Sequence, residues 1–227
     1  DFFLVGSDQV WRPRFALNLG QFFLNFIDGA KTGRISYSAS FGVDYDEYSD
    51  EERAMAVSLM PLFNAVSVRE ESGIKLCGEI FGIDAVCTLD PTMLLTSEDY
   101  DNLSVEAPLS SGNLMTYILD ESQRTDEIID NVAKERGLTP FRVNSKVEMG
   151  DNEPKLSNRQ QPPVENWLRG FRDAEYVITD SFHACVFSII YNKPFLCIGN
   201  DFRGLARINS LLGQFGLMDR LVSIDSD

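Results

Sequence analysis

The 227-residue sequence contains a single histidine, His183, and only four cysteines. No two cysteines form a C-x-x-C pair, so a zinc site made of Cys and His side chains is hard to assemble. Each cysteine lies in an apolar stretch, which predicts four reduced, buried thiols in a cytosolic protein. The sequence also lacks the P-loop, G-x-G-x-x-G, H-E-x-x-H and G-x-S-x-G motifs. We therefore expect neither a catalytic metal nor a bound cofactor.

Basic residues are scarce, with 20 Lys and Arg against 35 Asp and Glu and a net charge of −15. This balance excludes a general nucleic-acid binder and docking on anionic lipid through a polybasic patch. An anionic substrate would have to be held by a local group of cations, because the overall field repels it. No apolar run approaches the roughly 18 residues of a membrane-spanning helix, and no secretory signal is visible. The expected location is the cytoplasm, with peripheral association at the inner face of the membrane left open.

Strand and helix patterns alternate along the chain. Short apolar or β-branched segments bounded by Gly, Asp or Pro predict strands at 1–6, 22–26, 34–40, 65–69, 84–88, 114–119, 141–143, 176–179 and 194–198. Apolar residues at helical spacing predict helices at 50–59, 72–81, 125–136, 164–171, 182–191 and 203–215. This alternation is typical of an α/β protein, with parallel strands and helices on both faces.

The stretch 96–111 is acidic, contains Pro108 and is followed by Gly112, so it is interpreted as a connection. It divides the sequence into two predicted Rossmann-like domains, at residues 1–105 and 106–227. The sequence opens directly on a strand that runs into a turn, so we expect the N-terminal domain to be incomplete.

A turn between a predicted strand and a predicted helix contains the only histidine. The strand ends at Thr179, Asp180 or Ser181 can cap the following helix, and His183 falls in its first turn. In open α/β sheets, ligands bind beyond the carboxyl ends of the strands and at helix N-termini. His183 is therefore a candidate functional residue, the alternative being a histidine that only packs or caps.

Further candidates are polar residues in similar turns and on the last helix. Ser7 and Asp8 follow the first strand, and Arg69 stands at a strand end just before a helix. Arg203 and Arg207 share one face of the last predicted helix, a pattern that suits recognition of phosphate or carboxylate. The alternatives are ordinary turns and salt bridges for the first three residues and a solvated basic face for the last two.

Six segments, taken in order, resemble the polysaccharide pyruvyltransferase family. They are Gly-Ser-Asp-Gln-Val-Trp at 6–11, Tyr-Ser-Ala-Ser-Phe-Gly at 37–42, Val-Arg-Glu-Glu-Ser-Gly at 68–73, Asp-Pro-Thr at 90–92, Val-Ile-Thr-Asp-Ser-Phe-His-Ala at 177–184 and Asn-Lys-Pro-Phe at 192–195. The resemblance implies transfer of the enolpyruvyl unit of phosphoenolpyruvate to two sugar hydroxyls, giving a cyclic pyruvate ketal and phosphate. It also implies a fold similar to the GT-B glycosyltransferases, with the site in the cleft between two Rossmann-like domains.

The resemblance assigns roles to individual residues. His183 matches the histidine of the family's Arg-Leu-His turn, and Arg69 matches an arginine that binds the donor. The sequence departs from the pattern at Ser181, where the family has an arginine; Arg203 and Arg207 are candidates to replace that cation.

Ketal formation needs a proton on the methylene carbon of phosphoenolpyruvate, a role suited to His183. A carboxylate, Asp180 or Asp8, would take the proton of the sugar hydroxyl, and the sequence does not choose between them. The expected partners are phosphoenolpyruvate and a sugar acceptor of a cell-surface or exopolysaccharide precursor, with a lipid-linked acceptor left open. Two alternatives remain, a nucleotide-sugar glycosyltransferase of the GT-B type and a non-catalytic carbohydrate-binding homologue.

Overall fold

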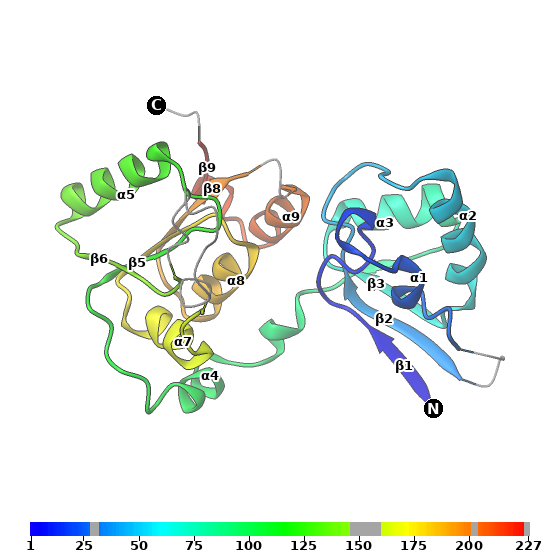
Figure 1. Ribbon diagram of the computed structural model, residues 1–227, viewed down its shortest axis with the longest axis horizontal. Coiled ribbons are helices and arrows are strands. Elements are labelled where there is room, and N and C mark those ends of the chain that lie inside the picture. The colour runs from blue at the N-terminus through cyan, green and yellow to red at the C-terminus, as the bar shows by residue number, and fades with distance from the viewer. Residues whose placement is uncertain (28–31, 146–159, 201–203, 225–227) are drawn as a thin grey trace. The chain divides into compact units, whose positions relative to one another are not determined.

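The computed structural model describes residues 1–27, 32–145, 160–200 and 204–224 (Figure 1). The chain folds into two compact units. The N-terminal unit comprises Asp1–Leu94 and Asp201–Met218, and the C-terminal unit comprises Leu95–Asn200 and Asp219–Asp227. Each has a parallel sheet and a Rossmann-like α/β character, which confirms the predicted mixture of strands and helices.

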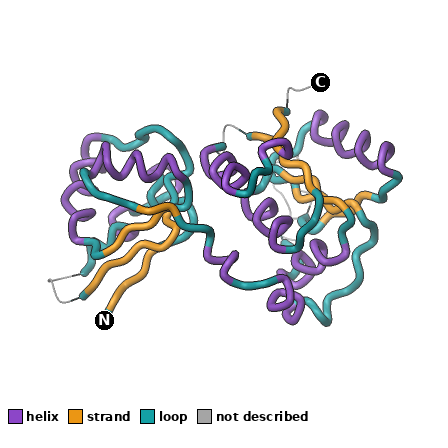
Figure 2. Tube along the Cα trace, turned by 180° about the vertical axis from the view of Figure 1, so that it is seen from behind, coloured by secondary structure: helices purple, strands orange, loops and turns teal. Residues whose placement is uncertain are grey.

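The sheet of the N-terminal unit has four parallel strands in chain order. They are β1 (Phe2–Val5), β2 (Gly33–Ala39), β3 (Ala65–Val68) and β4 (Val86–Cys87). The helices of this unit are α1 (Leu19–Phe22), α2 (Asp50–Leu59), α3 (Glu71–Leu76) and α9 (Ala206–Gln214). Figure 2 shows α1 to α3 gathered along its strands. Because all four strands run in the same direction, their carboxyl ends lie at one edge of the sheet.

Local signals set the helix limits in this unit. At the start of α2, the Ser49 and Glu52 side chains each accept a hydrogen bond from the other's backbone N–H, a capping box. The helix ends where Pro61 enters a short 3₁₀ turn, as the sequence predicts. After α3, the π-helical turn Cys77–Phe81 ends at Gly82, whose φ of 66° is left-handed.

An aromatic cluster forms the core of the N-terminal unit. Trp11 stacks on Phe23 with ring centroids 5.6 Å apart, and Phe41 stacks on Phe81 at 6.1 Å. The predicted strand at 22–26 is wrong, because α1 ends there and the chain continues in hydrogen-bonded turns. Its run of aromatic residues reflects burial in this core rather than pairing in a sheet.

The C-terminal unit has five parallel strands in the order β6-β5-β7-β8-β9. They are β5 (Leu114–Tyr117), β6 (Pro140–Arg142), β7 (Tyr176–Thr179), β8 (Phe195–Gly199) and β9 (Leu221–Ser223). The helices that the described residues of this unit form are α4 (Ser97–Leu103), α5 (Gln123–Arg136), α7 (Val164–Asp173) and α8 (Phe182–Ile190). The chain leaves β5 to one side for β6 and then returns to the other side for β7. The order therefore reverses at β5, and ligands of such sheets bind at the carboxyl ends next to this reversal.

The sequence does not predict α4, which lies in the stretch 96–111 interpreted as a connection. A capping box between Thr96 and Asp99 starts the helix, and Tyr100 packs on Phe187 with ring centroids 4.7 Å apart. Helix α4 has a polar composition, so its one buried aromatic residue, Tyr100, produces no pattern that predicts a helix. Strand β9 is also absent from the prediction.

The burial of α8 agrees with its apolar sequence, since Ala184, Cys185 and Val186 are fully buried. The four cysteines are free, but Cys87 is half-buried rather than buried. Among the helices that the structure describes, none is both long enough and apolar enough to cross a membrane.

Candidate functional site

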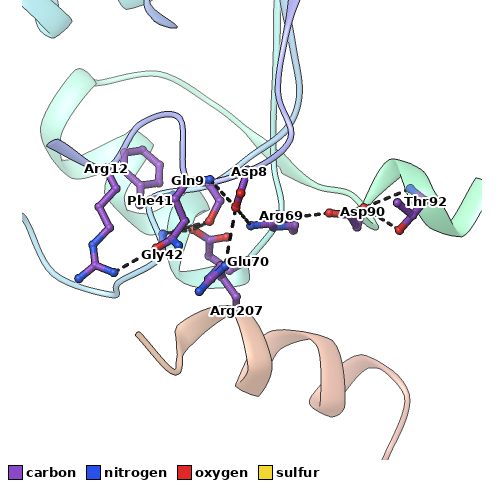
Figure 3. A network of polar contacts seen from close by, with 11 residues as sticks. Asp8, Gln9, Arg12, Phe41, Gly42, Arg69, Glu70, Asp90, Thr92 and Arg207 are labelled. Carbon is purple, nitrogen blue, oxygen red and sulfur yellow. Dashed lines mark hydrogen bonds and ion pairs between the residues drawn. The ribbon is translucent and has the colours of Figure 1, made fainter. Parts of the chain in front are cut away.

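Three charged side chains meet at the carboxyl edge of the N-terminal sheet, each from the segment after a different strand (Figure 3). Arg69 follows β3, and its Nη1 lies 2.7 Å from Oδ2 of Asp90, which follows β4. Its Nη2 lies 3.1 Å from Oδ1 of Asp8, which follows β1. The side chains of Arg69 and Asp90 are 1% exposed, whereas that of Asp8 is 67% exposed. A buried ion pair is thus capped by a carboxylate open to solvent.

A second arginine approaches the same carboxylate from α9. Nη1 of Arg207 lies 3.8 Å from Oδ1 of Asp8, and its side chain is 9% exposed (Figure 3). The pKa of Arg207 is lowered to about 10, mainly by burial and also by the charge of Arg69, while Asp8 opposes the change. Arg207 is therefore not part of a solvated basic face. Two guanidinium groups converge on one exposed carboxylate.

Contacts on both sides of Arg207 hold α9 against the N-terminal unit. The backbone N–H of Glu71 donates to Oγ of Ser210 at 3.1 Å. Gly204, just before α9, has a φ of 86°, and a Cβ there would lie 2.1 Å from the carbonyl oxygen of Gly42. Only glycine fits this approach without displacing the backbone, so the close contact fixes the start of the segment that carries Arg207.

Glu70 organises the loop that follows β2. Its Oε1 accepts hydrogen bonds from Oγ of Ser40 at 3.0 Å and from the backbone N–H groups of Phe41 at 2.7 Å and Gly42 at 3.0 Å. The side chain is fully buried, and desolvation raises the pKa of Glu70 although Arg69 and these donors lower it. Glu70 thereby positions the loop that contacts Gly204.

A cavity of about 370 Å³ opens beside this cluster. Asp8, Gln9, Val10, Phe15 and Phe22 line it. Asp8 is the charged residue among these described lining residues, and its carboxylate is the one that pairs with Arg69. The cavity therefore gives a small ligand access to the edge of the arginine cluster.

In the C-terminal unit, His183 lies in the first turn of α8, as predicted, and is half-buried. Its ring stands edge-on to that of Phe182, with centroids 5.4 Å apart. Ser181 occupies the N-cap position, but its side chain makes no capping hydrogen bond. Instead the N–H of Ser181 donates to Oγ1 of Thr179 at 3.0 Å. The predicted position of the cap agrees with the structure, since Ser181 is the N-cap residue, but the expected capping bond from the Ser181 side chain is not formed. The carboxylate of Asp180 accepts from another loop.

Asp180 connects two adjacent loops of the C-terminal unit. Its carboxylate is buried and accepts hydrogen bonds from the backbone N–H groups of Leu119 at 2.8 Å and Asp120 at 2.9 Å. Asp180 therefore fixes the turn between β5 and α5, next to the reversal in strand order.

The sequence matches a known family over most of its length. Residues 1–202 match the family model for polysaccharide pyruvyl transferase. The chain belongs to the polysaccharide pyruvyl transferase family. No curated protein matches it.

The structure distributes the predicted site residues of this family member over both units. Ser7, Asp8, Arg69 and Arg207 belong to the N-terminal unit, where all but Ser7 form the cluster described above. Ser7 is half-buried in the turn after β1. Asp180, Ser181 and His183 belong to the C-terminal unit, and Arg203 lies outside the described residues. Within those residues, no three His, Cys, Asp or Glu side chains are grouped to hold a metal ion.

Sequence reasoning missed two acidic residues of the pyruvyl transferase cluster. The sequence places Asp90 at a strand end, where a salt bridge, a cap or a turn explains it equally well, and Glu70 enters only as part of the segment at 68–73 that resembles the family. The sequence signal that could have identified Asp90 and Glu70 is their position. Both follow predicted strands of one parallel sheet, and the carboxyl ends of such strands lie at the same edge. Reading all such positions together would have placed Asp90 beside Arg69.

Proposed function

We propose that the chain transfers the enolpyruvyl unit of phosphoenolpyruvate to sugar hydroxyls and forms a pyruvate ketal on a cell-surface or exopolysaccharide precursor. Membership of the polysaccharide pyruvyl transferase family supports a transferase of this kind. The structural observation that carries the proposal is the convergence of Arg69 and Arg207 on Asp8. The GT-B arrangement of the two units, and action at the inner face of the membrane on a lipid-linked acceptor, are parts of the same proposal.

In this reaction, Arg69 and Arg207 bind the anionic groups of the donor. Charge-assisted hydrogen bonds from guanidinium groups to carboxylate or phosphate are the strong ones in proteins. Both side chains are held by ion pairs before the donor arrives, which reduces the entropy lost when the complex forms. The carboxylate of Asp8 occupies the position between them, so an incoming anion displaces it or rotates it towards solvent.

The chemical steps need an acid and a base. His183 protonates the methylene carbon of phosphoenolpyruvate, and a sugar hydroxyl attacks the carbon that bears the phosphate as a base takes its proton. The second hydroxyl then attacks the same carbon, the bond from this carbon to the phosphate oxygen breaks, and the hydroxyl proton leaves with the phosphate, which closes the ketal. Because both oxygens of Asp180 already accept backbone hydrogen bonds, the exposed Asp8 is the better placed of the two carboxylates to act as the base.

The test of the proposal is acceptor-dependent release of phosphate from phosphoenolpyruvate. The purified chain is incubated with nitrophenyl and lipid-linked sugars, and mass spectrometry detects a product heavier by one pyruvate less one water. His183→Asn should lower the rate by roughly 10²–10⁴ with the donor KM little changed. Acceptor-independent release, or transfer from a nucleotide sugar instead, contradicts the proposal.

Arg207→Ala tests the donor site separately. Loss of one charge-assisted bond, about 1.5–3 kcal/mol, weakens donor binding by roughly ten- to a hundredfold. Lys75→Ala is the matched control, since this α3 side chain is 68% exposed and carries the same charge. Equal donor KM values in the two variants would remove Arg207 from the donor site.

A further inference from the structure

The C-terminal unit contains a second cavity, of about 500 Å³, at the carboxyl ends of β5 and β6. Its volume falls within the range of about 300–1,000 Å³ typical of small-molecule sites. Its position, beside the reversal in strand order at β5, is where parallel α/β sheets bind their ligands. None of the site residues expected from the sequence is among the described residues that line this cavity.

The chemistry of the lining differs from that of the arginine cluster. Asp120 and Glu121 contribute carboxylates, Asn144 and Gln161 contribute amides, and the described lining includes no lysine or arginine. Arg142 forms an ion pair with Glu121, and the side-chain amide of Asn200 donates to Asp120, so the cation next to this wall is already paired. Such a wall offers phosphate and carboxylate ligands less attraction than the arginine cluster does. It suits a neutral molecule with many hydroxyl groups, since carboxylate and amide oxygens accept hydrogen bonds from hydroxyls and the amide N–H groups donate to them.

Contacts within the unit hold the wall in place without a ligand. The side chain of Asn144 donates from Nδ2 to the carbonyl oxygen of Ile118 at 3.0 Å, and the N–H of Ser145 donates to Oε1 of Gln161 at 3.2 Å. Asp180 fixes the opposite wall through the N–H groups of Leu119 and Asp120. A cavity whose polar groups are positioned in advance binds at a lower entropic cost.

Two further features point to a sugar. The Oδ1 atom of Asn144 is buried and accepts no hydrogen bond from the described residues, so a small rotation of this side chain towards the cavity would let a hydroxyl donor satisfy it. Tyr117 lines the cavity, and its ring is held edge-on by Trp167 with centroids 5.7 Å apart. A rigid aromatic wall provides apolar contact for the C–H face of a pyranose ring.

We propose that this cavity binds the acceptor as a neutral pyranoside, through the carboxylates of Asp120 and Glu121 and the amides of Asn144 and Gln161. The role of this sugar as the acceptor rests on the proposed pyruvyl transfer, whereas the binding of a neutral sugar in this cavity does not. This assignment separates the two substrates by charge, with the anionic donor at the arginine cluster and the uncharged sugar ring in the C-terminal unit.

The test measures sugar binding directly, without phosphoenolpyruvate. Saturation-transfer NMR is recorded on the full chain with methyl pyranosides of glucose, galactose, mannose and their 2-acetamido derivatives, with glucose 6-phosphate as the anionic comparison. We expect at least one neutral glycoside to bind and glucose 6-phosphate not to compete with it. Absence of binding by every neutral glycoside, or stronger binding of the phosphorylated sugar, overturns the proposal.

Two variants locate the binding. Leu119→Trp fills the cavity and should weaken binding by at least tenfold, whereas Leu109→Trp, at a side chain 77% exposed in the same unit, should not. Glu121→Gln keeps the size of the side chain and should weaken binding by roughly tenfold through loss of a charged acceptor, with Glu98→Gln in α4 as its control. Circular dichroism verifies that each variant is folded. Unchanged sugar binding in folded Leu119→Trp and Glu121→Gln overturns the proposal.

Turnover distinguishes this proposal from the proposed function. If both stand, the cavity variants raise the acceptor KM and leave the donor KM unchanged. If neutral sugars bind in the cavity but phosphate is never released from phosphoenolpyruvate, the cavity stands and the pyruvyl transfer fails. If phosphate is released and the cavity variants keep the wild-type acceptor KM, the transfer stands and the cavity is not the acceptor site.

Discussion

Replacing Asp180 separates a positioning role from a catalytic one. Its carboxylate is 4% exposed and accepts hydrogen bonds from the N–H groups of Leu119 and Asp120. Alanine removes both acceptors and leaves the two N–H donors without this partner, in a turn where Leu119 and Asp120 are themselves exposed. At about 1.5–3 kcal/mol for each hydrogen bond to a charged group, Asp180→Ala should lose roughly 3–6 kcal/mol. Asparagine keeps one acceptor oxygen, so Asp180→Asn should lose about half of that amount.

Hydrogen exchange with mass spectrometry reports the effect where it arises. The peptide that contains Leu119 and Asp120 should exchange at least tenfold faster in Asp180→Ala, since about 1.4 kcal/mol corresponds to a factor of ten. Urea unfolding monitored in the C-terminal unit should show the same order of the variants, with Asn between wild type and Ala. Asp130→Ala, at an exposed carboxylate of α5, is the control and should change neither quantity.

The opposite pattern would refute the reasoning. If Asp180→Ala retains wild-type stability and exchange while turnover is abolished, the two backbone hydrogen bonds carry no weight and Asp180 acts on the substrate. The reasoning is supported if Asp180→Ala lowers both the hydrogen-exchange protection of the turn and the affinity of the second cavity for sugar. Asp180 then positions the wall that includes Leu119 and Asp120.

Three further changes test the N-terminal unit. Asp8→Asn should lower the donor KM, because its carboxylate competes with the donor for Arg69 and Arg207, and should also lower kcat, because Asp8 is the proposed base; an unchanged kcat would remove Asp8 as the base, and an unchanged donor KM would contradict the competition. Glu70→Gln should alter the pH dependence of unfolding. The pKa of Glu70 is raised in the folded state above its ordinary 4.5, so its contribution to stability is greatest below pH 4.5 and declines as pH rises through the folded-state pKa. The free energy of unfolding of wild type relative to Glu70→Gln should therefore fall over that window in urea titrations, and a constant difference would contradict the assigned direction. Gly204→Ala should destabilise the N-terminal unit by about 1–3 kcal/mol and raise the donor KM, because its Cβ would meet the Gly42 carbonyl oxygen at 2.1 Å; kinetics and melting like those of wild type would show that the segment can shift without cost.

Elements with strong local signals were predicted closely from the sequence. Helix α2 runs over Asp50–Leu59 and strand β7 over Tyr176–Thr179, the predicted limits in both cases. In each, a capping residue, a proline or a compact β-branched run marks the ends within a few residues. Helix α4 escaped prediction because one buried tyrosine on a polar helix leaves no periodic pattern.

The candidate site depended more on distant contacts. Helical spacing placed Arg207 on a polar face, but not against Asp8, which stands near the other end of the sequence. The sequence likewise placed Asp180 at a strand end, where it could cap a helix or meet a substrate. Its partners are backbone N–H groups of another loop, and backbone donors carry no side-chain signature. The sequence predicts the residue types at the site and their positions in turns. It does not predict which charged side chains form ion pairs with one another in the folded chain.

The return of residues 201–218 to the N-terminal unit has a consequence for how the chain is made. Ribosomes release the N-terminus first, and domains usually fold as they emerge. Here β1 to β4 have all left the ribosome before the C-terminal unit is made, yet Arg207 arrives only after β5 to β8 of the five-stranded sheet have been synthesised. Until then, Asp8 and Arg69 lack the second guanidinium group. A nascent or prematurely terminated chain would thus have its first sheet but an unfinished arginine cluster, and a contiguous fragment ending at Leu94 could not supply it.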